Sequence, residues 1–222
     1  MNMPESIRLL QDTAADGDEN MTRDRNLVGD LPVVRVYEWS APWVTLGRYQ
    51  DPETSLLPGC GVPWTRRPTG GKAVLHGHDL TVAVFLPAAP GELTVKRAYR
   101  LLIHPIVSAL RQVGVGAALG EQTTFITRGL RTADCFRHVS PNDVVDPVTG
   151  RKLVGCALRL DSQGVLAQCS IPMGVPLVPP EQVFREPHRV GGIPEGATDR
   201  PTLRQALGEA FRASLGGAVR VQ

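Results

Sequence analysis

The sequence lacks the features that would place its cysteines in a metal site or in a disulfide framework. It has 222 residues and four cysteines, and none of them forms a CxxC pair or a spacing typical of zinc sites. Residues 1–12 contain no apolar signal-peptide core, and no apolar run is long enough to span a membrane. We therefore expect a cytoplasmic protein with reduced thiols, of which one or more can be reactive.

A basic excess and a linker are also missing. The formal net charge is +2, with 42% apolar and 21% charged residues, which excludes general disorder and argues against nucleic-acid binding. Any anion-binding role must then come from a local cluster of cations. With no internal repeat and no low-complexity segment, we expect one domain over residues 1–222 and no separate C-terminal accessory domain.

The hydrophobic pattern mixes hairpins with single helices. The clearest helices are predicted over 94–114 and 199–217, where apolar residues recur at helical spacing, and a weaker one lies within 11–30. Strands are predicted at 4–10, 32–40 (half-buried), 43–49 and 78–87, followed by a meander over 142–173. This order predicts an α+β fold with mixed, largely antiparallel sheets and flanking helices.

The segment "RRPTGGKAVLH" concentrates cations beside a flexible turn. Gly70 and Gly71 allow the backbone to approach a ligand closely, while Arg66, Arg67 and Lys72 supply positive charge. The spacing is not that of a P-loop. The motif indicates a turn that binds an anionic or carbonyl-bearing ligand, and the alternative is a solvated basic hairpin turn.

Two histidines follow this turn. His76 and His78 flank a glycine and point the same way if the segment is a strand, so a metal pair is conceivable. No third ligand is evident, which favours a core or pocket histidine. We expect no metal site.

A second cluster surrounds Cys135. Asp134, Arg137 and His138 are its neighbours, and Lys152 follows a tight turn at 146–150. A nearby cation favours the thiolate, which attacks acyl groups well, and a hairpin would return Lys152 towards Cys135. The alternative is a half-buried structural cysteine with a solvated lysine.

Taken together, the segments "RRPTGGKAVLH", "CF", "SPNDVV", "GRKLVGCALR" and "GVLAQCSI" resemble the lipoate-protein ligase A and octanoyltransferase superfamily, which shares its catalytic fold with biotin-protein ligases. The order of motifs is most similar to the cysteine-dependent octanoyl-[acyl-carrier-protein]:protein N-octanoyltransferases. The resemblance covers most of residues 5–175.

The resemblance implies roles by position. Cys135 matches the acyl-accepting nucleophile and Lys152 the lysine that contacts the acyl carbonyl, whereas Arg67, Gly70, Gly71 and His76 match the substrate-binding turn and strand; Lys72 joins them by its charge. Octanoyl would pass from acyl carrier protein to Cys135, then to a lysine of a lipoyl domain or of glycine cleavage H protein. Partner access favours a monomer, and a thioester donor requires no cofactor.

An octanoyl chain needs a narrow apolar slot. Val74, Leu80, Val82 and Val154 lie on predicted strands that could line one.

Three departures from the family pattern keep other functions open, and the first is Gly77, where relatives often have Asp after the motif histidine. Gln168 and Cys169 stand where relatives often have His and Gly, and "SPNDVV" resembles the ligase branch. One alternative is an ATP-dependent lipoate ligase, which would use ATP and magnesium and direct Lys152 at an acyl-adenylate. Another is a non-catalytic protein that binds lipoyl domains.

Overall fold

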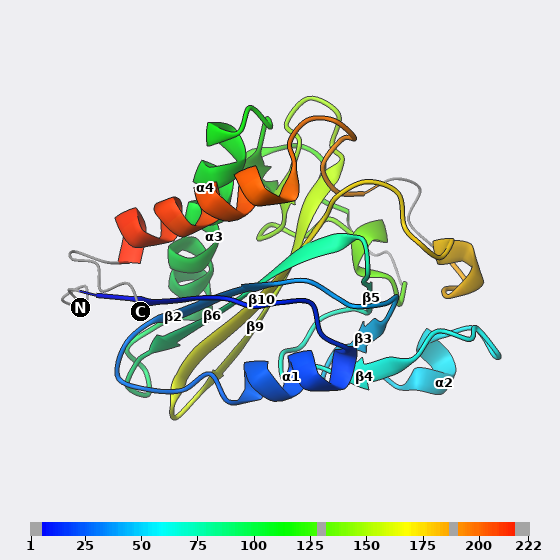
Figure 1. Cartoon of the computed structure of the whole chain (residues 1–222), viewed down its shortest axis with the longest axis horizontal. Helices are drawn as coiled ribbons and strands as arrows, with labels where there is room; N and C mark the ends of the chain where they lie inside the picture. The colour runs from blue at the N-terminus through cyan, green and yellow to red at the C-terminus, as the bar shows by residue number, and fades with distance from the viewer. Residues whose placement is uncertain (1–5, 128–131, 187–190, 216–222) are drawn as a thin grey trace.

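The structure is a computed structural model that describes residues 6–127, 132–186 and 191–215 (Figure 1). Its α-helices in these ranges are α1 (Gly17–Arg25), α2 (Pro52–Ser55), α3 (Val95–Gln112) and α4 (Arg200–Leu215). Its strands are β1 (Arg8–Gln11), β2 (Val33–Tyr37), β3 (Val44–Leu46), β4 (Trp64–Arg66), β5 (Val74–Leu75), β6 (Asp79–Pro87), β7 (Ala118–Leu119), β8 (Val144–Val145), β9 (Lys152–Asp161) and β10 (Gly164–Pro172). Three short 3₁₀ turns cover Gly120–Gln122, Cys135–Arg137 and Pro180–Gln182.

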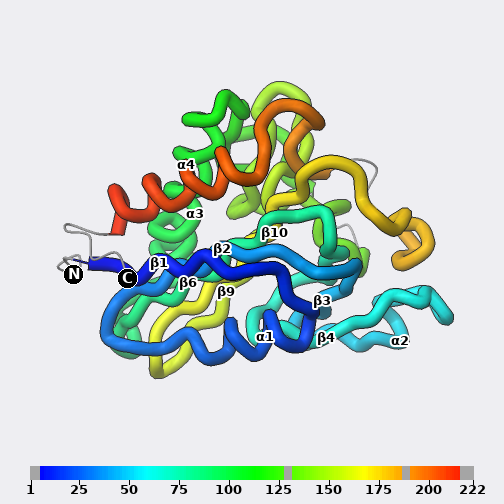
Figure 2. Tube along the Cα trace, in the orientation of Figure 1, coloured from blue at the N-terminus to red at the C-terminus, as the bar shows by residue number. Residues whose placement is uncertain are grey.

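The main sheet has seven strands in the order β1-β2-β6-β10-β9-β8-β7. Strand β1 runs parallel to β2 at one edge, as Figure 2 shows, and the other pairings described in this sheet are antiparallel. The predicted α+β fold with mixed, largely antiparallel sheets is therefore confirmed.

Helices cover both faces of this sheet (Figure 1). Strand β6 illustrates the division, because successive side chains of a strand point to opposite faces. Leu80 and Val82 lie in the larger core with α3 and α4, whereas Ala83 and Phe85 pack in the smaller core with α1. All five residues of β2 are buried, so the half-buried strand predicted there is wrong: helices on both sides cover a strand that lies between β1 and β6.

The second sheet is small and carries the glycine turn. Its order is β4-β3-β5, with β3 parallel to β4 and antiparallel to β5. The segment between β4 and β5 is the "RPTGGKA" stretch of the sequence. This sheet therefore positions the motif beside the middle of the main sheet.

The predicted ends of α3 and the predicted start of α4 are confirmed, whereas the predicted end of the second helix at residue 217 lies outside the described residues. The Thr94 side chain accepts a hydrogen bond from the Arg97 N–H at the start of α3, and Gly114 follows its end with a φ of 81°. Asp199 accepts from the Thr202 N–H at the start of α4. None of the helices within the described ranges has both the length and the apolar character to cross a membrane.

Candidate active site

The glycine turn is held from within by Arg67. Its guanidinium is buried and donates to the carbonyls of Thr45 (3.1 Å), Gly70 (2.6 Å) and Lys72 (2.6 Å). Gly71 has a φ of 84°, in the left-handed region that favours glycine. Burial lowers the pKa of Arg67 to about 10. Arg67 therefore clamps the turn through backbone oxygens.

The other two cations of the motif also contact carbonyls. Arg66 donates to the carbonyls of Gly47, Arg48 and Gln50, and the Lys72 ammonium donates to that of Thr132 at 2.6 Å. The motif is thus not the solvated basic turn of the alternative interpretation. Lys72 lines the cavity described below, whereas Arg66 is not among the residues around it.

The turn positions the cysteine through Ala73. The Ala73 N–H donates to the Ala133 carbonyl (2.8 Å), and the Cys135 N–H donates to the Ala73 carbonyl (2.9 Å). Asp134, which is buried, accepts from the Phe136 N–H and starts the short 3₁₀ turn that carries Cys135. Two segments that are far apart in sequence are therefore fixed against each other at the site.

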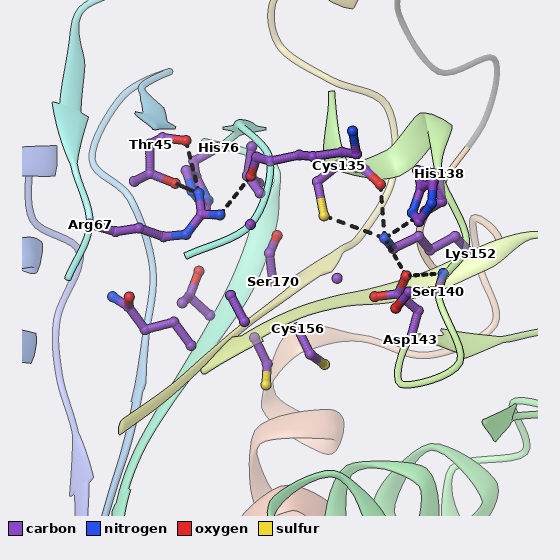
Figure 3. A pocket seen from close by; sticks show the side chains of 18 of the residues that line it. Thr45, Arg67, His76, Cys135, His138, Ser140, Asp143, Lys152, Cys156 and Ser170 are labelled. Atoms are coloured by element: carbon purple, nitrogen blue, oxygen red, sulfur yellow. Dashed lines mark hydrogen bonds and ion pairs between the residues drawn. The ribbon is translucent and has the colours of Figure 1, made fainter. Parts of the chain in front are cut away.

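Lys152 lies next to Cys135, as the predicted hairpin requires (Figure 3). Its Nζ is 3.4 Å from the Cys135 Sγ and donates to the carbonyls of Cys135 and His138, each at 2.8 Å. It also forms an ion pair of 2.8 Å with Asp143, whose carboxylate accepts from the Ser140 N–H. Lysine and aspartate are both almost completely buried.

Burial dominates the electrostatics of this cluster. It raises the pKa of the Cys135 thiol, and the opposing charges of Lys152 and Arg67 do not reverse that shift, which Asp143 reinforces. This direction runs against the expectation that Lys152 ionises Cys135. Although burial disfavours the Lys152 ammonium, Asp143 more than compensates, so the pKa of Lys152 is raised and the lysine is a fixed cation. Burial and the charge of Lys152 lower the pKa of His138.

His76 belongs to a separate buried chain of polar groups. Its Nδ1 lies 2.7 Å from Asp79 and its Nε2 lies 2.8 Å from the Thr45 hydroxyl, while its ring stacks on Trp39 at 3.8 Å. Burial alone would raise the pKa of Asp79, but the charge and hydrogen bond of His76 hold it below its usual range. Among the described residues, no group of three or more His, Cys, Asp or Glu side chains is arranged to hold a metal ion.

These groups surround one cavity of about 230 Å³ (Figure 3). Its lining includes Cys135, Lys152, Arg67 and His76 together with side chains from α1, α3 and the main sheet. Val74 lines it as predicted. The other three predicted slot residues, Leu80, Val82 and Val154, belong to the core beneath α3 and α4, so that part of the prediction is wrong.

Comparison with known families decides the classification. The family model for the lipoyl protein ligase A/B catalytic domain matches residues 13–198. The chain belongs to this family.

Curated relatives include two octanoyltransferases LipM. The protein from Exiguobacterium sp. is 32% identical over 183 residues, covering 75% of this chain and 66% of its own length. The protein from Geobacillus kaustophilus is 34% identical over 149 residues, covering 62% and 52%. The chain thus spans between half and two thirds of the length of these relatives.

Solved structures of other family members share the fold. A bi-partite lipoate protein ligase from Thermoplasma acidophilum matches with a TM-score of 0.71 and 21% identity, covering 100% of this chain and 86% of its own. A lipoate-protein ligase A bound with ATP matches with a TM-score of 0.68 and 20% identity, covering 96% and 86%.

The sequence did not predict the contacts of two residues at this site, Asp143 and Gln168. Asp143 was visible only as part of "SPNDVV", and no spacing indicated its ion pair with Lys152. Gln168 was noted as a departure from the family pattern. It accepts from the Thr69 hydroxyl (2.7 Å) and donates to buried Asp24 (2.6 Å), so it connects the glycine turn to α1.

Proposed function

We propose that the protein is an octanoyltransferase that moves an octanoyl group from an acyl carrier protein thioester, through Cys135, to a lysine amine of a lipoyl domain or of glycine cleavage H protein. The observation that carries the proposal is the 3.4 Å contact between the Cys135 thiol and the Lys152 ammonium at the cavity described above. A thiol beside a fixed cation suits acyl transfer from a thioester.

In the first half-reaction the Cys135 sulfur bonds to the thioester carbonyl carbon. The bond from that carbon to the donor sulfur breaks, and the donor leaves as a thiol with the proton that Cys135 gives up. Negative charge develops on the carbonyl oxygen in between. Lys152 redirects one N–H to this oxyanion, away from its backbone carbonyls.

In the second half-reaction the acceptor amine attacks the Cys135 thioester. An amide bond forms, the carbon–sulfur bond breaks, and a proton from the amine restores the Cys135 thiol. The raised pKa of Cys135 favours this return to the neutral thiol. No nucleotide is consumed, because the donor thioester already carries the activation.

The substrate-binding residues contribute through the turn. Gly70 and Gly71 bring backbone close to the acyl group, and Lys72 adds charge at the cavity. Arg67 and His76 act by holding this backbone in place, since their polar contacts are to Thr45, the turn carbonyls and Asp79. A monomer in the cytoplasm, a single domain over 1–222 and the absence of a cofactor remain predictions attached to this proposal.

An ATP-dependent lipoate ligase is the second candidate. The buried Lys152–Asp143 ion pair and the raised pKa of the thiol favour it, because a fixed cation with a neutral cysteine suits an acyl-adenylate better than a nucleophile. In that reaction Lys152 would contact the adenylate, and ATP with magnesium would be required.

Acceptor modification separates these candidates. The protein is incubated with a lipoyl domain and either octanoyl-acyl carrier protein without ATP, or free octanoate or lipoate with ATP and magnesium. We expect acceptor octanoylation only in the first mixture, and its loss in Cys135→Ala but not in the matched Cys60→Ala. Modification only in the second mixture would establish the ligase. No modification in either mixture would favour a non-catalytic protein that binds lipoyl domains.

A further inference from the structure

We propose that Cys156 and Cys169 form a modification site: a pair of thiols that a peroxide converts reversibly into a disulfide between β9 and β10. This inference does not depend on the proposed acyl transfer. It rests on the register of two strands and on the placement of both side chains at one cavity.

The two cysteines are direct partners across the hairpin. Cys156 on β9 lies opposite Cys169 on β10, and both side chains line the same cavity. Both cysteines are free. A disulfide requires neighbouring backbones and side chains on the same face of the sheet, and opposed residues of an antiparallel pair meet both conditions.

The hydrogen-bond pattern identifies Cys156–Cys169 as a non-hydrogen-bonded pair, the kind in which the two Cα atoms lie closer together. The hairpin closes at Asp161 and Gly164 with two residues between them, and closing pairs of this type are hydrogen-bonded. Hydrogen-bonded and non-hydrogen-bonded pairs then alternate along the strands. The alternation makes Cys156–Cys169 a non-hydrogen-bonded pair, for which Cα atoms lie about 4.5 Å apart, within the range of disulfides.

A hydrogen bond between the end of β10 and the start of β6 supports this assignment. The Met173 N–H, just beyond β10, donates at 2.9 Å to the carbonyl of His78, which directly precedes β6. Odd-numbered residues of β10 therefore direct their backbone polar groups towards β6. The backbone of Cys169 accordingly faces β6 and leaves the β9 side non-hydrogen-bonded.

Cys135 lies against Gly155, the neighbour of Cys156 in the sequence. A Cβ on Gly155 would lie 2.9 Å from the Cys135 sulfur, so Gly155 faces Cys135. The next residue, Cys156, packs against the core that contains Cys169, and both cysteines line the cavity that also contains Cys135 (Figure 3). Cys169 is buried in the same core, whereas Cys156 is partly exposed.

The chemistry balances with a peroxide as the oxidant. The Cys156 sulfur, the more accessible of the two, attacks one peroxide oxygen, which gives a sulfenic acid and releases water. The Cys169 sulfur then attacks the sulfenic sulfur, forms the S–S bond and releases a second water. A thiol reductant reverses the reaction.

Intact-mass and peptide measurements test the site in a Cys60→Ser/Cys135→Ser background, which retains only these two thiols. After hydrogen peroxide treatment of the folded protein we expect a loss of roughly 2 Da, reversed by dithiothreitol. Trypsin should yield peptides 153–159 and 160–185 joined by a disulfide. A third substitution, Cys156→Ala, should abolish the cross-link while circular dichroism shows an unchanged fold.

Two results would overturn the proposal. One is a gain of oxygen at Cys156 without a cross-link. The other is unmodified thiols under conditions that oxidise Cys60 in the wild-type protein.

Discussion

At the scale of the residue, the Lys152 ammonium has three N–H groups but four close partners. Its three N–H groups face Asp143 and the carbonyls of Cys135 and His138 at 2.8 Å, with the Cys135 sulfur farther away at 3.4 Å. The sulfur is thus the weakest of four contacts. In the proposed reaction, one N–H would leave a backbone carbonyl to reach the oxyanion.

Two substitutions should move the pKa of Cys135 in opposite directions. Asp143→Asn removes a charge that raises this pKa, so we expect it to fall and alkylation at neutral pH to accelerate. Lys152→Met removes a charge that lowers it, so we expect it to rise further and alkylation to slow. The measurement is the pH dependence of iodoacetamide labelling of the peptide that contains Cys135. Shifts of the same sign would contradict this electrostatic account.

Gly155 has no side chain and therefore leaves room for the Cys135 sulfur. Because an added Cβ would come within 2.9 Å of the Cys135 sulfur, Gly155→Ala should displace the sulfur from Lys152 and slow the acylation of Cys135 by roughly tenfold or more. Gly116→Ala is the matched control, since its Cβ would have no neighbour closer than 3.9 Å. Equal acylation rates of the two variants in a rapid-mixing assay would show that this spacing is unimportant.

At the scale of the element, the glycine turn and the short turn at Cys135 act as a unit joined by Ala73. Gly71→Ala places a side chain at a φ of 84° and 3.1 Å from the Arg67 guanidinium. We expect a loss of stability of about 1–2 kcal/mol from the backbone strain and, in addition, a reduced reactivity of Cys135.

Gly59 provides the control for strain alone. It also has a positive φ, of 68°, but an added Cβ would meet nothing within 4 Å. Gly59→Ala should therefore lose similar stability in urea unfolding while its Cys135 is alkylated at the wild-type rate. If both variants changed Cys135 equally, the turn would not be what positions it.

At the scale of the whole molecule, buried Asp79 makes the stability of the folded protein depend on pH. The pKa of Asp79 is lower in the folded protein than in the unfolded chain, so its contribution to stability is present above the unfolded pKa and is lost as pH falls below it. Urea unfolding from about pH 6 to about pH 3 should show a steeper decline for the wild type than for Asp79→Asn. Parallel declines would mean that Asp79 does not contribute in this window.

The sequence predicted what depends on local pattern. The hairpin over β9 and β10 and helices α3 and α4 follow from alternation, turn residues and caps, and the approach of Lys152 to Cys135 follows from the turn at 146–150. The family motifs supplied the rest of the candidate site.

What the sequence did not predict depends on burial between distant segments. The complete burial of β2 requires helices on both faces, and the raised pKa of Cys135 requires the enclosure of the thiol by the glycine turn. The core positions of Leu80 and Val82 depend on which face of β6 meets α3, which alternation alone leaves undetermined. Asp143 gained its role only by proximity in space.

The central claim is that Cys135 carries the acyl group, and trapping that intermediate tests it most directly. The protein is mixed with octanoyl-acyl carrier protein without ATP or acceptor, and the intact mass and the peptide that contains Cys135 are measured. We predict one octanoyl group on Cys135, removed when a lipoyl domain is added and absent from Cys135→Ala. An unmodified Cys135 under conditions in which a lipoyl domain becomes octanoylated would contradict the account.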